Sequence, residues 1–294
     1  MLRFRTEATV KLSEPDDSPM GDKAPERDLV ILHQFPRSPF VPNLSPFCLK
    51  IETFLRLYNI KYELKESWTN HTDKGQLPYI ELNGERISES QAIIFKLVKH
   101  FRVKENISPR DAAIGRAVDR MLDGSTFYTL MNDKMLNNQA FMSREVTGLK
   151  VPGILGKFVA SRFANKLKAR IMVGAGNLTN DDLMEVMKRD LRACADLLGD
   201  KPFLLGGRMT MVDCTLFGHL ASTYYLPFPQ HIQELLDHDH QNLKNYVERI
   251  RDTVYYDIPK PDRFDLVKAG VEAERRNSQI KSAHDGPRKE KMTF

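Results

Sequence analysis

Strand-forming sequence is confined to the first third of this 294-residue chain, and that asymmetry limits the architectures it can adopt. Residues 29–32 form a short, branched apolar run, which is typical of a strand buried on both faces of a sheet. Ser45 and Pro46 then supply a helix cap and a proline at the first helical position. Apolar residues recur at helical spacing up to Tyr58, and residues 61–65 alternate polar and apolar as a strand does. The sequence therefore predicts a β-α-β unit.

A β-hairpin is expected next. Asn83-Gly84 separates two short strand-like segments, and this dipeptide strongly favours a two-residue hairpin turn. A second helix opens near Ser88 and continues to about Val98. A β-α-β unit followed by β-β-α is the element order of a thioredoxin-like domain, which we assign to residues 28–101.

Helix signals replace strand signals from Ser108 onwards. Ser108, Thr179 and Thr210 are each followed three residues later by an aspartate, which is the pattern of a helix capping box. We expect a helix after each, the first reaching about Leu136, and a further helix over residues 240–254. The predicted fold is therefore an α/β thioredoxin-like N-terminal domain followed by an all-α C-terminal bundle.

The segments outside these domains are polar. We assign residues 108–262 to the helical bundle, residues 1–27 to a disordered lead-in and residues 265–294 to a charged tail. No apolar stretch approaches the roughly 20 residues that span a bilayer, and the N-terminus lacks an apolar secretory core. We expect a cytoplasmic protein.

Cysteine usage argues against a disulfide framework and against a metal site. The three cysteines, Cys48, Cys194 and Cys214, are widely spaced and form no Cys-x-x-Cys pair. That pattern fits a reducing compartment. No metal ligands are predicted.

Positive charge is concentrated in one predicted helix. The net charge is +5, yet residues 140–172 alone hold seven Lys or Arg against one Glu. Residues 155–171 place apolar side chains every fourth residue, with basic residues between them. Two interpretations stay open: a bundle helix with a solvated basic face, or a surface for an anionic membrane or an acidic protein. No nucleic-acid recognition motif accompanies the basic residues, so we do not expect nucleic-acid binding.

Four short motifs and the domain order together resemble the glutathione transferases. The motifs are Ser45-Pro46-Phe47-Cys48, Gly75-Gln76-Leu77-Pro78, Glu89-Ser90 and the segment 207–213. The longer segment from Leu32 to Arg56, with its Ser-Pro-Phe-Cys-Leu-Lys core, strongly resembles the failed axon connections family. Relatives of that family are the nematode cadmium-responsive proteins and the metaxins.

The resemblance implies a glutathione site and, as is usual in the superfamily, a homodimer. Ser45 would activate the glutathione thiol, with Cys48 as the second candidate. The residues that would bind the tripeptide are Gln76, Leu77, a cis Pro78, Glu89 and Ser90.

Each of these residues also has a purely structural interpretation. Ser45 before proline is an excellent helix cap, and a thiol donor would need the same position. Cys48 lies one turn into the helix, where an inert core thiol is expected more often than a reactive one. Pro78 could form a rigid turn, and Ser88 with Glu89 could form an ordinary capping sequence.

Two departures from typical transferases bear on activity. The loop over residues 36–44 is long and rich in proline, and residues 67–76 are short and polar.

The metaxins end in a membrane anchor that the charged end of this chain does not resemble, so we do not expect their import role. The resemblance implies a regulatory or interaction factor in axon or cell development, with a retained glutathione site. The alternative is a glutathione-dependent transferase or thiol reductase in detoxification or metal stress.

Overall fold

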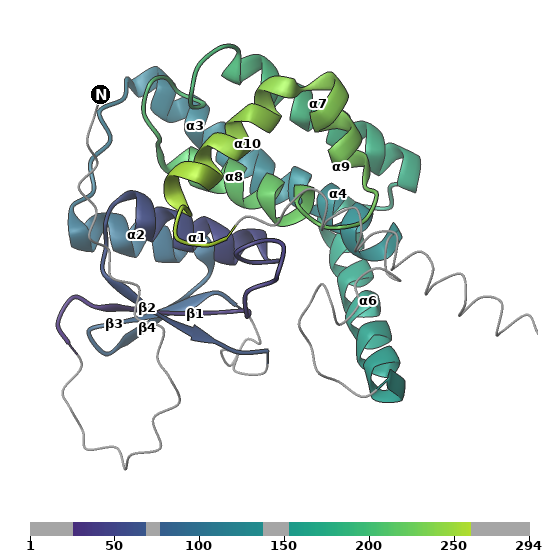
Figure 1. The fold of residues 1–294 in the computed structure, drawn as a ribbon, viewed down its shortest axis with the longest axis horizontal. Coiled ribbons are helices and arrows are strands. Elements are labelled where there is room, and N and C mark those ends of the chain that lie inside the picture. Colours follow the sequence, from purple (N-terminus) through teal and green to yellow (C-terminus); the bar gives the residue numbers. More distant parts are fainter. Residues whose placement is uncertain (1–25, 69–76, 138–152, 260–294) are drawn as a thin grey trace, which may run out of the picture.

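A small mixed sheet forms the first layer of the fold. The computed structural model describes residues 26–68, 77–137 and 153–259. Its strands are β1 (Val30–Gln34), β2 (Tyr62–Glu66), β3 (Tyr79–Leu82) and β4 (Glu85–Ser88), in the order β2-β1-β3-β4. β1 pairs in parallel with β2 and antiparallel with β3, and β3 pairs antiparallel with β4. Helices α1 (Pro46–Leu57) and α2 (Ser90–Phe101) lie on one face of this sheet (Figure 1). This is the predicted thioredoxin-like arrangement.

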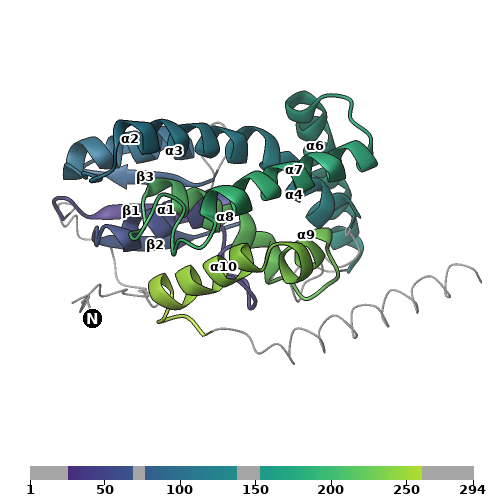
Figure 2. The same ribbon diagram turned by 90° about the horizontal axis from the view of Figure 1, so that it is seen from above.

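Helices make up the rest of the described chain (Figures 1 and 2). They are α3 (Pro109–Met121), α4 (Phe127–Met131), α6 (Gly153–Ala175), α7 (Asn180–Leu198), α8 (Met211–Tyr224), α9 (His231–Glu234) and α10 (Gln241–Val254). Three wider π-helical turns join or extend them, namely η1 (Leu122–Thr126), η2 (Asn132–Asn137) and η4 (Leu235–Asp239). The predicted all-α bundle is confirmed.

Most local signals in the sequence led to the right element. Asn83 and Gly84 have φ of 51° and 82°, as a two-residue hairpin turn requires. Thr179 and Thr210 each form the expected capping box. The helix predicted after Ser108 does reach Asn137, but η1 and η2 interrupt its α-helical winding, which apolar periodicity does not reveal.

Several predictions concern residues that the structure does not describe. Residues 1–25 of the predicted lead-in and the whole charged tail at 265–294 lie outside the described ranges, as does Gln76. Among the described residues, no helix is long and apolar enough to cross a lipid bilayer.

Helix α1 is buried on both of its sides. Ile51 and Phe54 pack against the sheet, whereas Leu49 belongs to the core of the helical domain. On the helical side, Gly218 of α8 faces the α1 backbone so closely that a Cβ there would lie 2.7 Å from the Pro46 carbonyl oxygen. The two domains therefore meet through a close α1–α8 crossing that requires glycine.

Gly218→Ala should destabilise the protein by about 1–3 kcal/mol, because the added methyl group overlaps backbone atoms of α1. Urea unfolding followed by circular dichroism measures the change. Gly124→Ala is the matched control, since Gly124 is helical and a Cβ added there would meet no atom within 4 Å. Equal stability of the two variants would contradict the close crossing.

Candidate functional site

Three chain segments meet at one edge of the sheet. In the strand register, His33, one residue before the end of β1, pairs with Tyr79, and Tyr79 pairs with Ser88 at the end of β4. The β1–α1 loop, the segment before β3 and the start of α2 are therefore neighbours. The described candidate residues all lie in or next to these segments.

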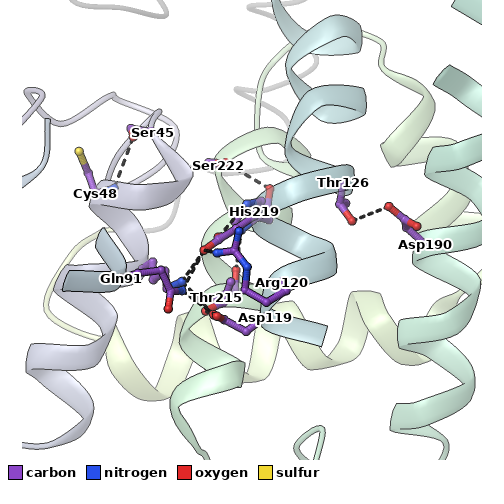
Figure 3. Close-up of polar contacts among 12 residues, drawn as sticks. Ser45, Cys48, Gln91, Asp119, Arg120, Thr126, Asp190, Thr215, His219 and Ser222 are labelled. Atoms are coloured by element: carbon purple, nitrogen blue, oxygen red, sulfur yellow. Dashed lines mark hydrogen bonds and ion pairs between the residues drawn. The ribbon is translucent and has the colours of Figure 1, made fainter. Parts of the chain in front are cut away.

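Ser45 is the N-cap of α1. Its backbone is extended, with φ −89° and ψ 122°, and its Oγ accepts a hydrogen bond from the Cys48 backbone N–H at 3.4 Å (Figure 3). The buried Asn43 holds the loop that leads into α1, because its Oδ1 accepts from the Ser45 N–H at 2.9 Å and its Nδ2 donates to the Phe35 carbonyl at 2.7 Å. A hydroxyl that accepts in this way can still donate its proton, so capping and thiol binding are compatible.

Cys48 points into the protein and has no exposed surface. Burial raises the pKa of its thiol to about 12, outweighing the opposing hydrogen bonds from Ser45 and the Phe35 backbone. The thiol therefore stays protonated at neutral pH, where only a thiolate is a strong nucleophile. This environment favours the interpretation of Cys48 as a packing residue.

The peptide bond between Leu77 and Pro78 is cis, as the resemblance implied. Pro78 is buried and leads directly into β3, whereas Leu77 is half-buried at the edge of the sheet.

Glu89 is the N-cap of α2 and has an uncommon backbone conformation. Its φ is 70° and ψ is 118°, its side chain is exposed, and it makes no side-chain capping hydrogen bond. Ser88 is instead the last residue of β4, so the capping sequence considered for Ser88 is wrong. Positive φ at a residue other than glycine costs free energy and is often kept at a ligand site. Ser90 follows, half-buried, as the first residue of α2.

A buried ionic network lies behind the start of α2. Lys50 of α1 is 2% exposed, and its Nζ donates to Asp119 and Asp123, both at 2.9 Å. Gln91 donates to the same two carboxylates at 2.7 and 3.0 Å, and Thr215 of α8 donates to Asp119 at 2.7 Å. Figure 3 shows Gln91, Thr215 and Asp119 converging from three helices. The network links α1 and α2 to the helical domain.

The network changes the ionisation of its members. Burial alone would raise the pKa of Asp119, but Lys50, Thr215 and Gln91 outweigh burial and hold that pKa below its ordinary value. His219 is fully buried nearby; burial lowers its pKa despite Asp123, whose Oδ1 lies 3.7 Å from Nε2. The His219 Nδ1–H donates to the Thr215 carbonyl at 2.9 Å.

A cavity of about 170 Å³ opens between α2, α3 and the start of α8. Lys50, Gln91 and Asp119 form its polar side, and Phe95 and Val212 contribute to its apolar side. Ser45, Pro78 and Glu89 do not line it, so this cavity is separate from the sheet-edge site. Within the described ranges, no group of three or more His, Cys, Asp or Glu side chains could hold a metal ion.

Sequence reasoning missed this network. Lys50, Asp119 and Asp123 are charged residues at helical spacing, and such residues normally face solvent. The one available signal was Gly218, a glycine in the middle of a helix, which suggests the close approach of another backbone.

The comparisons with known proteins agree with this architecture. The family model "Glutathione S-transferase N-terminal domain" matches residues 46–140, and "Glutathione S-transferase, C-terminal domain" matches residues 187–250. A solved glutathione transferase, GSTFuA3 from Phanerochaete chrysosporium, superposes with a TM-score of 0.54 at 15% identity, over 76% of this chain and 97% of that one. The protein therefore has the two-domain glutathione transferase fold.

Sequence relatives narrow the assignment. Failed axon connections of Drosophila melanogaster is 30% identical over 300 residues, covering 90% of this chain and 71% of that protein. The chain belongs to the failed axon connections family. It is also 25% identical to isoprene-epoxide–glutathione S-transferase of Rhodococcus sp. (strain AD45), over 74% of this chain and 95% of that one. Metaxin-2 of Mus musculus is 23% identical, over 58% of this chain and 68% of that one.

Lys50→Met should destabilise the protein by about 3 kcal/mol at neutral pH, because it removes the buried cation between Asp119 and Asp123 and leaves them only the exposed Arg116 and Arg120, at 3.2 and 3.8 Å. The low pKa of Asp119 stabilises the wild type at neutral pH, and this contribution is lost as pH falls through that value. In the variant the pKa of Asp119 rises because Lys50 no longer offsets burial, so stability should increase as the pH is lowered from about 7 to about 5.

Urea unfolding at a series of pH values measures both effects. Lys61→Met is the control: Lys61 is exposed and pairs with Glu26 at 2.5 Å, so its loss should cost about 1 kcal/mol or less. A Lys50→Met protein that loses stability on acidification as the wild type does would contradict the assigned network.

Proposed function

We propose that the protein binds glutathione, or a similar small thiol peptide, at the sheet edge formed by Ser45, Leu77, Pro78, Glu89 and Ser90. The observation that carries this proposal is the conformation of Glu89. Its backbone is held at φ 70° while its carboxylate is exposed and bonded to no described residue. The Glu89 carbonyl accepts the Ile93 N–H where α2 begins, but its carboxylate makes no contact with a described residue that would require the strained backbone, and a ligand bound to that carboxylate would account for it.

The chemistry of the γ-glutamyl group matches this helix start. That group carries an ammonium and a carboxylate. Glu89 would bind the ammonium, while the Ser90 hydroxyl and the free N–H groups of the first turn of α2 would bind the carboxylate. Gln76, which lies outside the described residues, and Leu77 would pair with the peptide backbone.

We propose a regulatory or interaction role in axon or cell development, with weak turnover at most. Family membership supports the developmental role, through the relative named failed axon connections. The buried, protonated Cys48 supports the weak turnover. Arg37 also holds the β1–α1 loop in place, because its guanidinium donates to the Pro42 carbonyl at 3.4 Å and forms an ion pair with Glu52 at 2.7 Å. A homodimer is the assembly we expect.

The alternative is a glutathione-dependent transferase or thiol reductase in detoxification or metal stress. The likeness to the Rhodococcus transferase and the position of Ser45 at a helix N-terminus favour it. Ser45→Ala and Cys48→Ser separate the roles: an activity unchanged in both variants would reject both residues as catalytic.

Isothermal calorimetry with reduced protein should detect glutathione binding in about the micromolar to millimolar range. Glu89→Ala and Ser90→Ala should each weaken binding about tenfold or more, since each removes a contact to a charged group. Glu85→Ala, at an exposed glutamate of β4 outside the site, is the matched control. Equal affinity in all four proteins, or no binding by the wild type, would reject the site.

A second candidate function concerns α6. Leu167 and Ile171 are buried in the bundle, whereas Arg162, Lys166, Lys168 and Arg170 are exposed. Met172, Val173 and Leu178 are also exposed, at 52%, 89% and 43%. Exposed apolar side chains beside basic ones are typical of surfaces that bind anionic lipid. We propose that this surface binds anionic membranes peripherally from the cytoplasm.

Sedimentation with phosphatidylserine-containing liposomes tests the α6 proposal. The wild type should pellet with anionic liposomes and not with phosphatidylcholine liposomes, and Lys166→Glu/Lys168→Glu should stay in the supernatant. Lys188→Glu, on α7, serves as the charge control. Equal recovery of the wild type in the supernatant with both lipids would reject membrane binding by this surface. An acidic protein would then be the partner to seek.

A further inference from the structure

Lys134 connects the two domains next to Ser45. It lies in the π-helical turn η2 and is 1% exposed. Its Nζ donates to the Leu44 carbonyl at 2.8 Å and to the Ser222 carbonyl at 3.1 Å. Leu44 directly precedes the Ser45 cap, and Ser222 belongs to α8. One amine therefore holds the entry to α1 against the helical domain.

The surroundings of this amine suit its neutral form. A neutral amine has two N–H donors, and two carbonyl oxygens accept them here, whereas an ammonium has a third N–H. Within the described part of the chain, Lys134 forms no ion pair with a carboxylate and finds no third acceptor. Burial accordingly lowers the pKa of Lys134 to about 7.

Other titratable groups on the surrounding elements are engaged elsewhere. Asp133, its neighbour on η2, accepts from the backbone and ring of His231 at 3.0 and 2.8 Å. His219 on α8 bonds to the Thr215 carbonyl, and Cys48 on α1 is a protonated thiol at neutral pH. On α6, Arg170 lies over the Phe127 ring. None of these side chains bonds to Lys134 among the described contacts.

We propose that Lys134 is a positioning residue of the glutathione site: as a neutral amine it fixes the Leu44–Ser45 peptide against α8, and its protonation weakens that hold. The proposal rests on the proposed function. It implies that the affinity for glutathione responds to pH through a residue that does not touch the ligand.

S-methylglutathione is the probe for this proposal, because it has no ionisable thiol. Its α-amino group still titrates over this range, so the quantity to compare is the ratio of the two proteins' affinities at each pH. Lys134→Gln keeps two N–H donors but cannot take up a proton, so the affinity of the wild type relative to that of Lys134→Gln should fall about fivefold between about pH 8.5 and about pH 6. The same pH dependence in both proteins would overturn the proposal. Lys134→Met replaces Lys134→Gln if the latter does not fold.

The two hydrogen bonds from Lys134 to the Leu44 and Ser222 carbonyls, which we call the clamp, can also be tested without any ligand, by unfolding free energies. The folded-state pKa of Lys134 is about 7 and the unfolded value is ordinary, so the unfolded chain binds more protons between these two values. Wild-type stability should therefore rise with pH from about 7 to about 10, and more steeply than that of Lys134→Gln. Equal slopes overturn the clamp. A steeper wild-type slope without S-methylglutathione binding shows that the clamp exists but that the proposed glutathione function fails.

Discussion

The ion pairs of Lys50 with Asp119 and Asp123 fix the relative orientation of the two domains. Lys50 belongs to the thioredoxin-like domain but is buried against α3. Burying its charge is tolerable because both carboxylates lie 2.9 Å from its Nζ, and Gln91 donates to both of them while Thr215 donates to Asp119. A shifted domain orientation would leave buried charges unpaired. In this domain orientation Gly218 packs against the Pro46 backbone. The chain just before Ser45 is then close enough to the helical domain for Lys134 to bond both the Leu44 and the Ser222 carbonyls.

A second buried charge fixes the other side of α1. Glu52 has no exposed surface and pairs with Arg37 at 2.7 Å and with Arg56 at 3.1 Å, while Tyr62 donates to it at 3.0 Å. Burial alone would raise its pKa, yet the two arginines hold that pKa below its ordinary value. Because Arg37 belongs to the β1–α1 loop, Glu52 also anchors the chain that leads to Ser45. The edge of the sheet is thus preorganised, which favours binding because little further ordering is needed.

Sequence reasoning found the parts of this protein that depend on local rules. The capping box at Thr179, the hairpin at Asn83-Gly84 and the order of strands and helices all follow from short-range preferences. It did not find the π-helical turns containing Asp123 and Lys134, which depend on tertiary packing. One interpretation that the sequence left open, Ser88 as an ordinary cap of α2, is wrong, because Ser88 ends β4 and Glu89 is the N-cap. The candidate site came from family resemblance, and its local geometry came from the structure.

The central claim is that a γ-glutamyl peptide binds where the starts of α1 and α2 meet the segment before β3. The most direct measurement is the change in backbone amide chemical shifts of ¹⁵N-labelled protein during a glutathione titration. We expect the largest saturable changes at Ser45, Leu77 and the amides from Glu89 to Gln91. Changes confined to the separate cavity near Phe95 and Val212, or no changes at all, would contradict the account.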